Sequence, residues 1–283
     1  MKTHPPQILI EGLRFPEGAF WSSQDGCLYF VEWTGDAVWT WCDGAAAVLF
    51  ETPPGAGPCG LAQDRAGNFW VCLYSARRLA KLGPSGRVLH VIDGYEGKRF
   101  KGPNDLVIDQ AGGVYFTDSG DFEDDWVTGR AAGAVYYLAP TGVLKRVDAG
   151  LCFPNGLALS DDGQTLWVNE HRKNRVLAYD IQPGGRLDRR HVFHTLPPQS
   201  LLPPASSYEL GPDGMCRDNR GRLWVAHYGA GRVIVLDTGS TRLGAVSLPR
   251  GIKPTNTAYD PIHDTLYITE SEQGLLYKVD LTE

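Results

Sequence analysis

Residues 154–170, PNGLALSDDGQTLWVNE, decide the fold of this chain. Apolar and polar residues alternate with a period of two on both sides of a turn at Asp161, Asp162 and Gly163, which predicts a β-hairpin. The second half of the hairpin carries a central aromatic residue, Trp167. A ring of that size suits the space between stacked sheets, so we expect it to pack in the core.

The same unit occurs six times. The copies begin at Pro16, Pro58, Pro103, Pro154, Pro212 and Pro254, with spacings of 42, 45, 51, 58 and 42 residues. The aromatic residue recurs at one position of each copy, as Tyr29, Trp70, Tyr115, Trp167, Trp224 and Tyr267. A near-regular repeat of this length is typical of a radial or solenoid architecture.

Further strand-like runs follow the hairpins, for example RVLAYDI and HVFHTL after residue 170. Four strands in each repeat of about 45 residues are typical of a propeller blade. We therefore predict an all-β fold, a single six-bladed β-propeller domain over residues 1–283 with four-stranded antiparallel blades. The last repeat is one strand short, so QILIEG at residues 7–12 is expected to supply its outer strand and close the ring.

Composition excludes several classes of protein. The chain has 283 residues and a formal net charge of −6 without a basic run, so we expect no binding to nucleic acid or to anionic membranes. It shows neither a secretory leader nor a membrane-spanning apolar run, which favours a cytoplasmic protein. We expect a monomer or a homodimer. The six cysteines form no CxxC pair and are expected to be buried thiols.

The residue after each proline occupies an equivalent place at the start of each innermost strand, so these six side chains should form a ring around the channel. They are Glu17, Cys59, Asn104, Asn155, Asp213 and Thr255. Two carboxylates brought together and desolvated repel each other unless a cation lies between them. Carboxylate and carboxamide oxygens predict one divalent cation, Ca²⁺ or Mg²⁺, with Mn²⁺ and Zn²⁺ still open. The alternative is a polar, water-lined channel.

The ends of the second strands should surround the same site. One aligned position holds Glu32, Leu73, Asp118, Glu170, His227 and Glu270, and the next holds Trp33, Tyr74, Ser119, His171, Tyr228 and Ser271. We consider His227 a candidate catalytic base, because histidine titrates near neutral pH, or else a hydrogen-bonding pocket residue. Asp118 and His171 are candidates for binding substrate hydroxyls, or else face solvent. Cys59 is interpreted as a small channel filler.

These motifs resemble a known family. Glu17 in PEG, Asn104 in PND, Asn155 in PNG and Asp213 in PDG match the metal-holding residues of the senescence marker protein, gluconolactonase and luciferin-regenerating enzyme family, from FPEGAFW to YITES. The resemblance implies a calcium-dependent six-bladed propeller that hydrolyses sugar lactones or related esters. It implies that the metal polarises the carbonyl, that Asp213 takes the proton of the attacking water, that Asn104 orients substrate or water, and that Glu17 and Asn155 hold the ion.

The chain departs from this family in one motif. An arginine two residues before the third-blade asparagine binds the sugar in aldonolactonase-like members, whereas Gly102 stands there in this chain. Lys101 or Arg99 could substitute for that arginine. The substrate therefore stays open, although the reaction class does not change.

Two long loops, residues 119–133 and 195–211, are candidate lids. Phe122, Trp126, Leu201, Leu202 and Tyr208 could wall a pocket for a lactone or ester less polar than an aldonolactone; protein contact or disorder is the alternative. Two other functions stay possible: a phosphotriesterase-like hydrolase on the same ring, and a non-enzymatic binding propeller. The sequence contains no serine nucleophile elbow, phosphate-binding glycine loop or HExxH motif.

Overall fold

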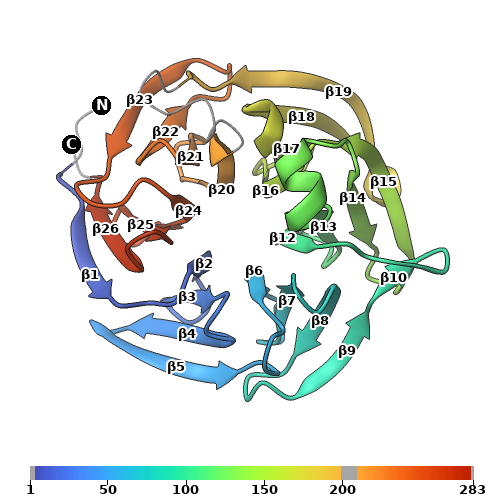
Figure 1. Ribbon diagram of the computed structural model, residues 1–283, viewed down its shortest axis with the longest axis horizontal. Coiled ribbons are helices and arrows are strands. Elements are labelled where there is room, and N and C mark those ends of the chain that lie inside the picture. Colours follow the sequence, from blue (N-terminus) through green and yellow to red (C-terminus); the bar gives the residue numbers. More distant parts are fainter. Residues whose placement is uncertain (1–3, 199–208, 282–283) are drawn as a thin grey trace.

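The computed structural model describes residues 4–198 and 209–281. Six four-stranded antiparallel sheets are arranged around a central axis (Figure 1), which confirms the predicted six-bladed β-propeller. The first strand of each hairpin lies nearest the axis, and it begins at the repeat proline or one residue before it. The innermost strands therefore bring the residues that follow these prolines to one end of the channel.

The strands follow one another blade by blade. Their bounds are β2 (Pro16–Ser22), β3 (Cys27–Glu32), β4 (Ala37–Cys42) and β5 (Ala45–Glu51); β6 (Pro58–Gln63), β7 (Phe69–Leu73), β8 (Arg78–Leu82) and β9 (Val88–Ile92); β12 (Pro103–Ile108), β13 (Val114–Asp118), β14 (Gly133–Leu138) and β15 (Leu144–Leu151); β16 (Pro154–Leu159), β17 (Thr165–Glu170), β18 (Arg175–Gln182) and β19 (Arg186–Thr195); β20 (Gly211–Arg217), β21 (Leu223–Tyr228), β22 (Arg232–Leu236) and β23 (Arg242–Ser247); and β24 (Pro254–Asp260), β25 (Thr265–Glu270), β26 (Leu275–Asp280) and β1 (Gln7–Glu11).

Short elements lie between these strands, one of them between the second and third blades and the others within the third and fourth blades. They are the hairpin β10 (Gly94–Tyr95) and β11 (Lys98–Arg99), and the helical turns η1 (Phe122–Trp126), η2 (His171–Lys173) and η3 (Pro183–Gly185). None of the helices in the described parts of the chain has the length and apolar character needed to cross a membrane.

The last blade is closed by the first strand. β1 pairs antiparallel with β26, with Gln7 opposite Lys278 and Glu11 opposite Leu275. This pairing confirms the predicted closure. It also covers the free edge of β26, which would otherwise present unpaired backbone groups.

The hairpin turns show why the repeats carry Asp followed three residues later by Gly. Asp109 Oδ1 accepts hydrogen bonds from the backbone N–H groups of Ala111 and Gly113, at 2.9 and 2.7 Å. Gly112 has φ +88°, a conformation that residues with a Cβ rarely adopt. Asp64 and Asp218 make the same bonds in their own hairpins.

The repeated aromatic side chains pack between neighbouring blades, as predicted. All six are at least 92% buried, and Trp224 is fully buried among Val233 and Val235 of its own blade and Tyr259 of the next. Burial of such large apolar surfaces is the main favourable contribution to folding.

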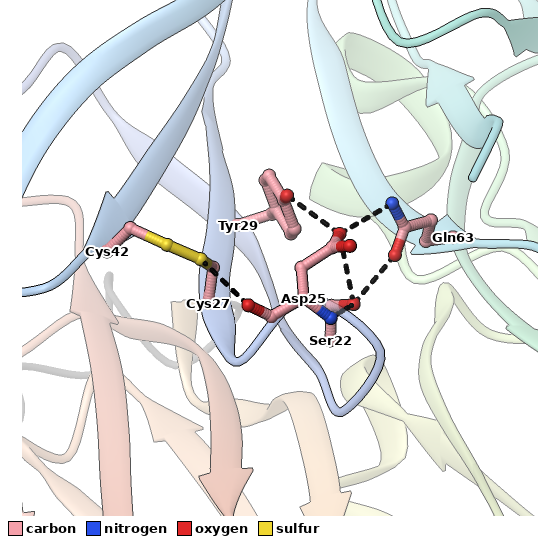
Figure 2. The surroundings of a disulfide bond; sticks show 6 residues. All are labelled: Ser22, Asp25, Cys27, Tyr29, Cys42 and Gln63. Carbon is pink, nitrogen blue, oxygen red and sulfur yellow. Dashed lines mark hydrogen bonds between the residues drawn. A yellow bond between two sulfur atoms is a disulfide. The ribbon is translucent and has the colours of Figure 1, made fainter.

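The expectation of six free thiols is wrong for one pair. The structure joins Cys27 to Cys42 as a disulfide (Figure 2), while the other four cysteines are free. Leu28 pairs with Trp41, so the register of β3 and β4 places Cys27 directly opposite Cys42. Cysteine spacing and the cellular compartment do not reveal this pair, because it depends on the register of the hairpin. Beside the disulfide, Asp25 accepts hydrogen bonds from Tyr29 and from Gln63 of the next blade, at 2.9 and 2.8 Å.

Candidate active site at one end of the channel

The predicted ring forms around a single pocket. Glu17, Asn104, Asn155 and Asp213 all line it, and Cys59 completes the same level. Each of the five is at least 92% buried. The sixth ring residue, Thr255, serves the fold instead: its hydroxyl donates to the backbone carbonyl of Pro16 at 2.7 Å and lies 2.8 Å from the Thr269 hydroxyl.

Side chains of neighbouring blades hold the backbone of the ring in place. The Thr117 hydroxyl of β13 donates to the carbonyl of Asn155 at 2.9 Å, and the Asn169 carboxamide of β17 donates to the carbonyl of Asp213 at 2.6 Å. Both interactions are buried and cross from one blade to the next. Sequence reasoning missed these two positioning residues, because a side chain-to-carbonyl contact between repeats leaves no mark in the repeat itself.

The ring carries buried carboxylates that repel one another. Burial and the nearby Asp105 raise the pKa of Glu17 to about 8, although the Gly18 N–H group, 3.3 Å away, opposes the shift. Burial, Glu17 and Asp105 raise the pKa of Asp213 well above its usual range, opposed by a hydrogen bond from Asn155. Within the described residues, no hydrogen-bond donor reaches the buried Asp213 Oδ1. A positive charge in the pocket would stabilise the ionised form of both carboxylates.

Asp105 is a further buried carboxylate that sequence reasoning missed. Burial raises its pKa to about 7, opposed by hydrogen bonds from backbone N–H groups and the Asn256 side chain. The signal was present in the repeats: four of the five other blades have glycine at the equivalent position, Gly18, Gly60, Gly156 and Gly214, and the sixth blade has Asn256. A Cβ on Gly60 would lie 2.6 Å from Asp105 Oδ1, so the glycine leaves room for this side chain.

The oxygen atoms that the ring turns toward the pocket belong to carboxylates and carboxamides. Among the described residues, no group of three or more His, Cys, Asp or Glu side chains could hold a metal ion. The ring offers two carboxylates and two carboxamides, oxygen donors of the kind that hard divalent cations take. Burial and the neighbouring carboxylates raise the pKa of the Cys59 thiol well above its usual range, so it stays protonated, as a channel filler would.

The carboxylates that end the second strands have a structural role. These second-strand carboxylates are Glu32, Asp118, Glu170 and Glu270, and each accepts backbone N–H groups of the loop that leads into its own inner strand. Asp118, for example, accepts from Lys101 at 3.1 Å and from Gly102 at 2.6 Å. None of the four lines the described pocket, so the expected contact of Asp118 with substrate is not supported.

His227 also lies away from the described pocket lining. Arg232 Nε donates to His227 Nδ1 at 3.3 Å, so the proton is on Nε2, which donates to Asn174 Oδ1 at 3.0 Å. Burial, with help from Arg232, lowers the pKa of His227 to about 3. A neutral histidine with both nitrogens engaged has no proton-accepting atom to offer a substrate.

The two basic residues considered for sugar binding are placed elsewhere as well. Lys101 Nζ forms an ion pair with Asp125 at 2.7 Å, and Arg99 is exposed on β11. Neither belongs to the described pocket lining. Of the predicted substrate-binding residues, Asn104 and His171 do line the pocket.

An aromatic wall stands over the ring. It consists of Phe15, Trp33, Tyr74, Phe122, Trp126, Phe153 and Tyr228, beside His171. Phe122 and Trp126 come from the first long loop, as expected, and their rings stack at 4.3 Å. Phe15 and Phe153, each directly before a repeat proline, were missed. Leu201, Leu202 and Tyr208 lie outside the described residues.

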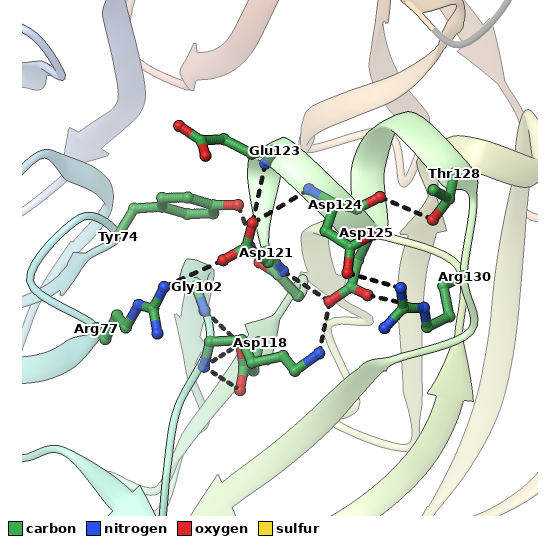
Figure 3. A network of polar contacts seen from close by, with 12 residues as sticks. Tyr74, Arg77, Gly102, Asp118, Asp121, Glu123, Asp124, Asp125, Thr128 and Arg130 are labelled. Atoms are coloured by element: carbon green, nitrogen blue, oxygen red, sulfur yellow. Dashed lines mark hydrogen bonds and ion pairs between the residues drawn. The ribbon is translucent and has the colours of Figure 1, made fainter.

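A polar network holds the turn η1 that carries Phe122 and Trp126 (Figure 3). Asp121 accepts hydrogen bonds from the backbone N–H groups of Glu123 and Asp124 and, at 3.1 Å, from the Arg77 side chain. Asp125 forms ion pairs with Lys101 and Arg130. Lys101 thus ties this turn to the loop that Asp118 fixes.

The chain is similar to proteins of one family. The family model described as "SMP-30/Gluconolactonase/LRE-like region" matches residues 15–272. A gluconolactonase of Zymomonas mobilis is 26% identical over 94% of this chain and 79% of its own length. A lactonase drp35 of Staphylococcus saprophyticus is 31% identical over 60% of this chain and 50% of its own length.

Solved structures agree with this match. A gluconolactonase of Xanthomonas campestris superposes with a TM-score of 0.81 at 29% identity, covering 98% of this chain and 89% of that one. Regucalcin of Agrobacterium tumefaciens, a calcium-binding protein, has a TM-score of 0.76 at 18% identity over 98% and 93% of the two chains, a likeness of fold. By the family match over most of its length, this chain belongs to the SMP-30/gluconolactonase/LRE-like family.

Proposed function

We propose that the protein opens lactones by hydrolysis and holds one divalent cation, Ca²⁺ in the first place, with Glu17, Asn104, Asn155 and Asp213. The reaction class rests on the family and on its gluconolactonase and lactonase relatives. The observation that carries the cation is the convergence of these four side chains in one pocket, with a buried Asp213 Oδ1 that no described donor reaches.

The chemistry of the donor set fits a hard cation. Two buried carboxylates whose pKa values are raised by burial and by neighbouring carboxylates are costly to ionise together, and a cation between them removes that cost. The two carboxamides add neutral oxygens, as calcium sites commonly do. Mg²⁺, Mn²⁺ and Zn²⁺ are the competing ions.

A bound cation would supply Lewis acidity toward the lactone carbonyl oxygen. Asp213 takes a proton from a water molecule whose oxygen adds to the carbonyl carbon. The bond from that carbon to the ring oxygen then breaks, and the ring oxygen takes up a proton as it leaves. One lactone and one water give one hydroxycarboxylate and one proton. Asn155, hydrogen-bonded to Asp213, orients the base.

The test measures the hydrolysis of a panel of lactones, followed by the release of acid, with the metal-free protein and with protein to which a divalent cation has been added back. We expect turnover that is lost after chelation and restored by Ca²⁺, Mn²⁺ or Zn²⁺, together with one bound cation per chain by elemental analysis. Asp213→Asn should lower turnover by more than ~100-fold, and added cation should not restore it. Asp260→Asn is the matched control, because Asp260 is equally buried and lies at the far end of β24.

Three results would contradict the proposal. If chelation leaves turnover unchanged, the cation has no role in the reaction. Hydrolysis of an organophosphate such as paraoxon without any lactone hydrolysis replaces the reaction with that of a phosphotriesterase. A protein that neither binds a cation nor hydrolyses any member of the panel is a binding propeller.

A further inference from the structure

We infer that the pocket selects a lactone with a flat, apolar body rather than a polyhydroxylated sugar lactone. This inference rests on the proposed lactone hydrolysis and concerns the part of the substrate that lies outside the reacting ester. It comes from the composition of the aromatic wall, from the way its polar atoms are used, and from two strained backbone positions.

The wall offers ring faces and few polar groups. Seven of its side chains are aromatic, and no Lys or Arg is among the described residues that line the pocket. A sugar lactone brings several hydroxyl groups, and each of them loses its water on entering such a pocket. A hydroxyl that is buried without a new hydrogen bond opposes binding.

The polar tips of the wall are already engaged with the protein. The Tyr74 hydroxyl donates to the Gly120 carbonyl at 3.0 Å, and Trp33 Nε1 donates to Ser75 Oγ at 3.2 Å. Tyr228 is hydrogen-bonded to Ser271. These three residues therefore present carbon surfaces to the pocket and keep their hydrogen-bonding groups behind it.

Two phenylalanines are held in a costly backbone conformation to reach the wall. Phe15 and Phe153 both have φ +56°, in the left-handed region that a bulky residue seldom adopts. Gly57 occupies the equivalent position in the second blade at φ +59°. A glycine would serve the fold equally well there, so the aromatic side chains at these positions serve the pocket.

The cavity between the aromatic wall and the ring residues is narrow, about 40 Å³, so a ligand that enters it lies against the side chains of the wall. Phe122 lies 4.3 Å from Trp126 and 5.5 Å from Trp33, ring centre to ring centre. A flat apolar body takes over such ring contacts one for one. A polyol makes no such contacts, and the aromatic wall offers its hydroxyl groups no hydrogen bonds in their place.

The experiment uses three six-membered lactones whose leaving groups are all aliphatic alkoxides: glucono-δ-lactone, δ-valerolactone and β-phenyl-δ-valerolactone. With the full chain and added cation, we expect kcat/KM for the phenyl lactone to exceed that for glucono-δ-lactone by at least ~10-fold, with δ-valerolactone between them. An equal or reversed order overturns the inference while leaving lactone hydrolysis intact.

Variants locate the selectivity. Phe122→Leu should lower the phenyl-to-glucono ratio, and so should Phe153→Gly, in which glycine accepts the positive φ. Phe193→Leu is the matched control, since Phe193 is half-buried against Trp167 on an outer strand away from the pocket, and it should leave the ratio unchanged. A ratio that is unchanged in both wall variants, with melting temperatures near that of the parent, also overturns the inference.

A binding measurement separates this inference from the proposed reaction. β-Phenyl-δ-valerolactam is not hydrolysed on the assay timescale, and we expect it to raise the melting temperature of the parent but not of Phe122→Leu. If no lactone is hydrolysed and the lactam still binds in this way, the ligand class stands and the proposed reaction fails. If glucono-δ-lactone is hydrolysed and the lactam does not bind, the reaction stands and the ligand class fails.

Discussion

The ring position and the end of the second strand both place buried acidic side chains around the same channel, yet the carboxylates at the two positions have opposite chemistry. Glu270 accepts three backbone N–H groups, from Lys253, Glu272 and Gln273, at 2.8 to 3.0 Å. Asp213 keeps one buried oxygen that no donor in the described chain reaches. The first arrangement satisfies a carboxylate within the fold, and the second leaves it available to a ligand.

The two positions also differ in how many residue types they hold across the six blades. Four of the six blades carry Glu or Asp at the end of the second strand, as a position with one structural task would. The ring position instead holds five residue types in six blades. In a repeat protein, uniformity at a buried polar position therefore indicates a structural role, and variety indicates a site.

Asp213→Asn should have the largest effect on this contrast. The change keeps the size of the side chain and one oxygen, but it removes the charge and the proposed base, so kcat should fall by more than ~100-fold. Saturating cation should not restore it. Asp118→Asn, in the second-strand set, should keep the kcat of the parent in the same acid-release assay.

His227→Ala sharpens this result. It should retain turnover, because His227 lies outside the described pocket lining. Loss of turnover in His227→Ala with substantial activity in Asp213→Asn would mean that the histidine is the base.

Glu270→Ala should show the structural side of the comparison. Three backbone N–H groups lose their hydrogen bonds to this carboxylate, and a hydrogen bond to a charged group contributes ~1.5–3 kcal/mol, so the free energy of unfolding should fall by at least ~2 kcal/mol. Denaturant titration measures this change. If stability is unchanged while cation affinity falls, Glu270 belongs to the site instead.

Asn155→Ala removes a neutral member of the ring. We expect cation affinity, measured by calorimetry, to fall by at least ~10-fold, and activity to recover in part when cation is added in excess. Asn68→Ala is a control, because that carboxamide bonds only within the turn at Asp64. A loss of activity that excess cation does not reduce would give Asn155 a role other than holding the ion.

The metal-free protein should become less stable as pH rises from about 5 to 8. Folding raises the pKa of Glu17 to about 8 and that of Asp105 to about 7, so across this window the folded state binds more protons than the unfolded state. Unfolding free energy therefore decreases with rising pH. We expect a fall in melting temperature of at least ~2–4 °C, the shift that ~1 kcal/mol produces.

Saturating Ca²⁺ should reverse this trend, because the cation binds the ionised ring. A melting temperature that rises with pH in the presence of chelator would show that folding does not raise the pKa values of these two carboxyl groups. Scanning calorimetry at several pH values makes the comparison.

The fold could be predicted from the sequence almost completely, because each blade repeats the same hairpin and six copies specify the architecture. The ring was predictable for the same reason: equivalent positions in a closed repeat meet at one axis. Trp33, Tyr74, His171 and Tyr228 were placed around the site by the same argument, and the structure brings all four to the pocket.

The rest depends on contacts that a repeat does not encode. Asp118 was expected in the pocket, but its oxygens are bound to the loop at Lys101 and Gly102, a contact that its sequence position does not reveal. His227 is engaged by Arg232 and Asn174, which belong to two different blades. Phe15 and Phe153 reach the pocket through a left-handed backbone conformation, which alternation of apolar and polar residues does not predict.

The pairing of β1 with β26 also orders events during synthesis. β1 is made first and has no partner until β26, the last strand, has been made. Glu17 in the first blade and Asp213 in the fifth are separated around the axis by the sixth, so they come to face each other only when that blade is in place. The entropy of joining segments so distant along the chain is therefore lost at one late step, and the oxygen donors assemble at that step as well. A nascent chain that stops short of β26 already contains all four donor residues, but it has no closed channel to hold them together.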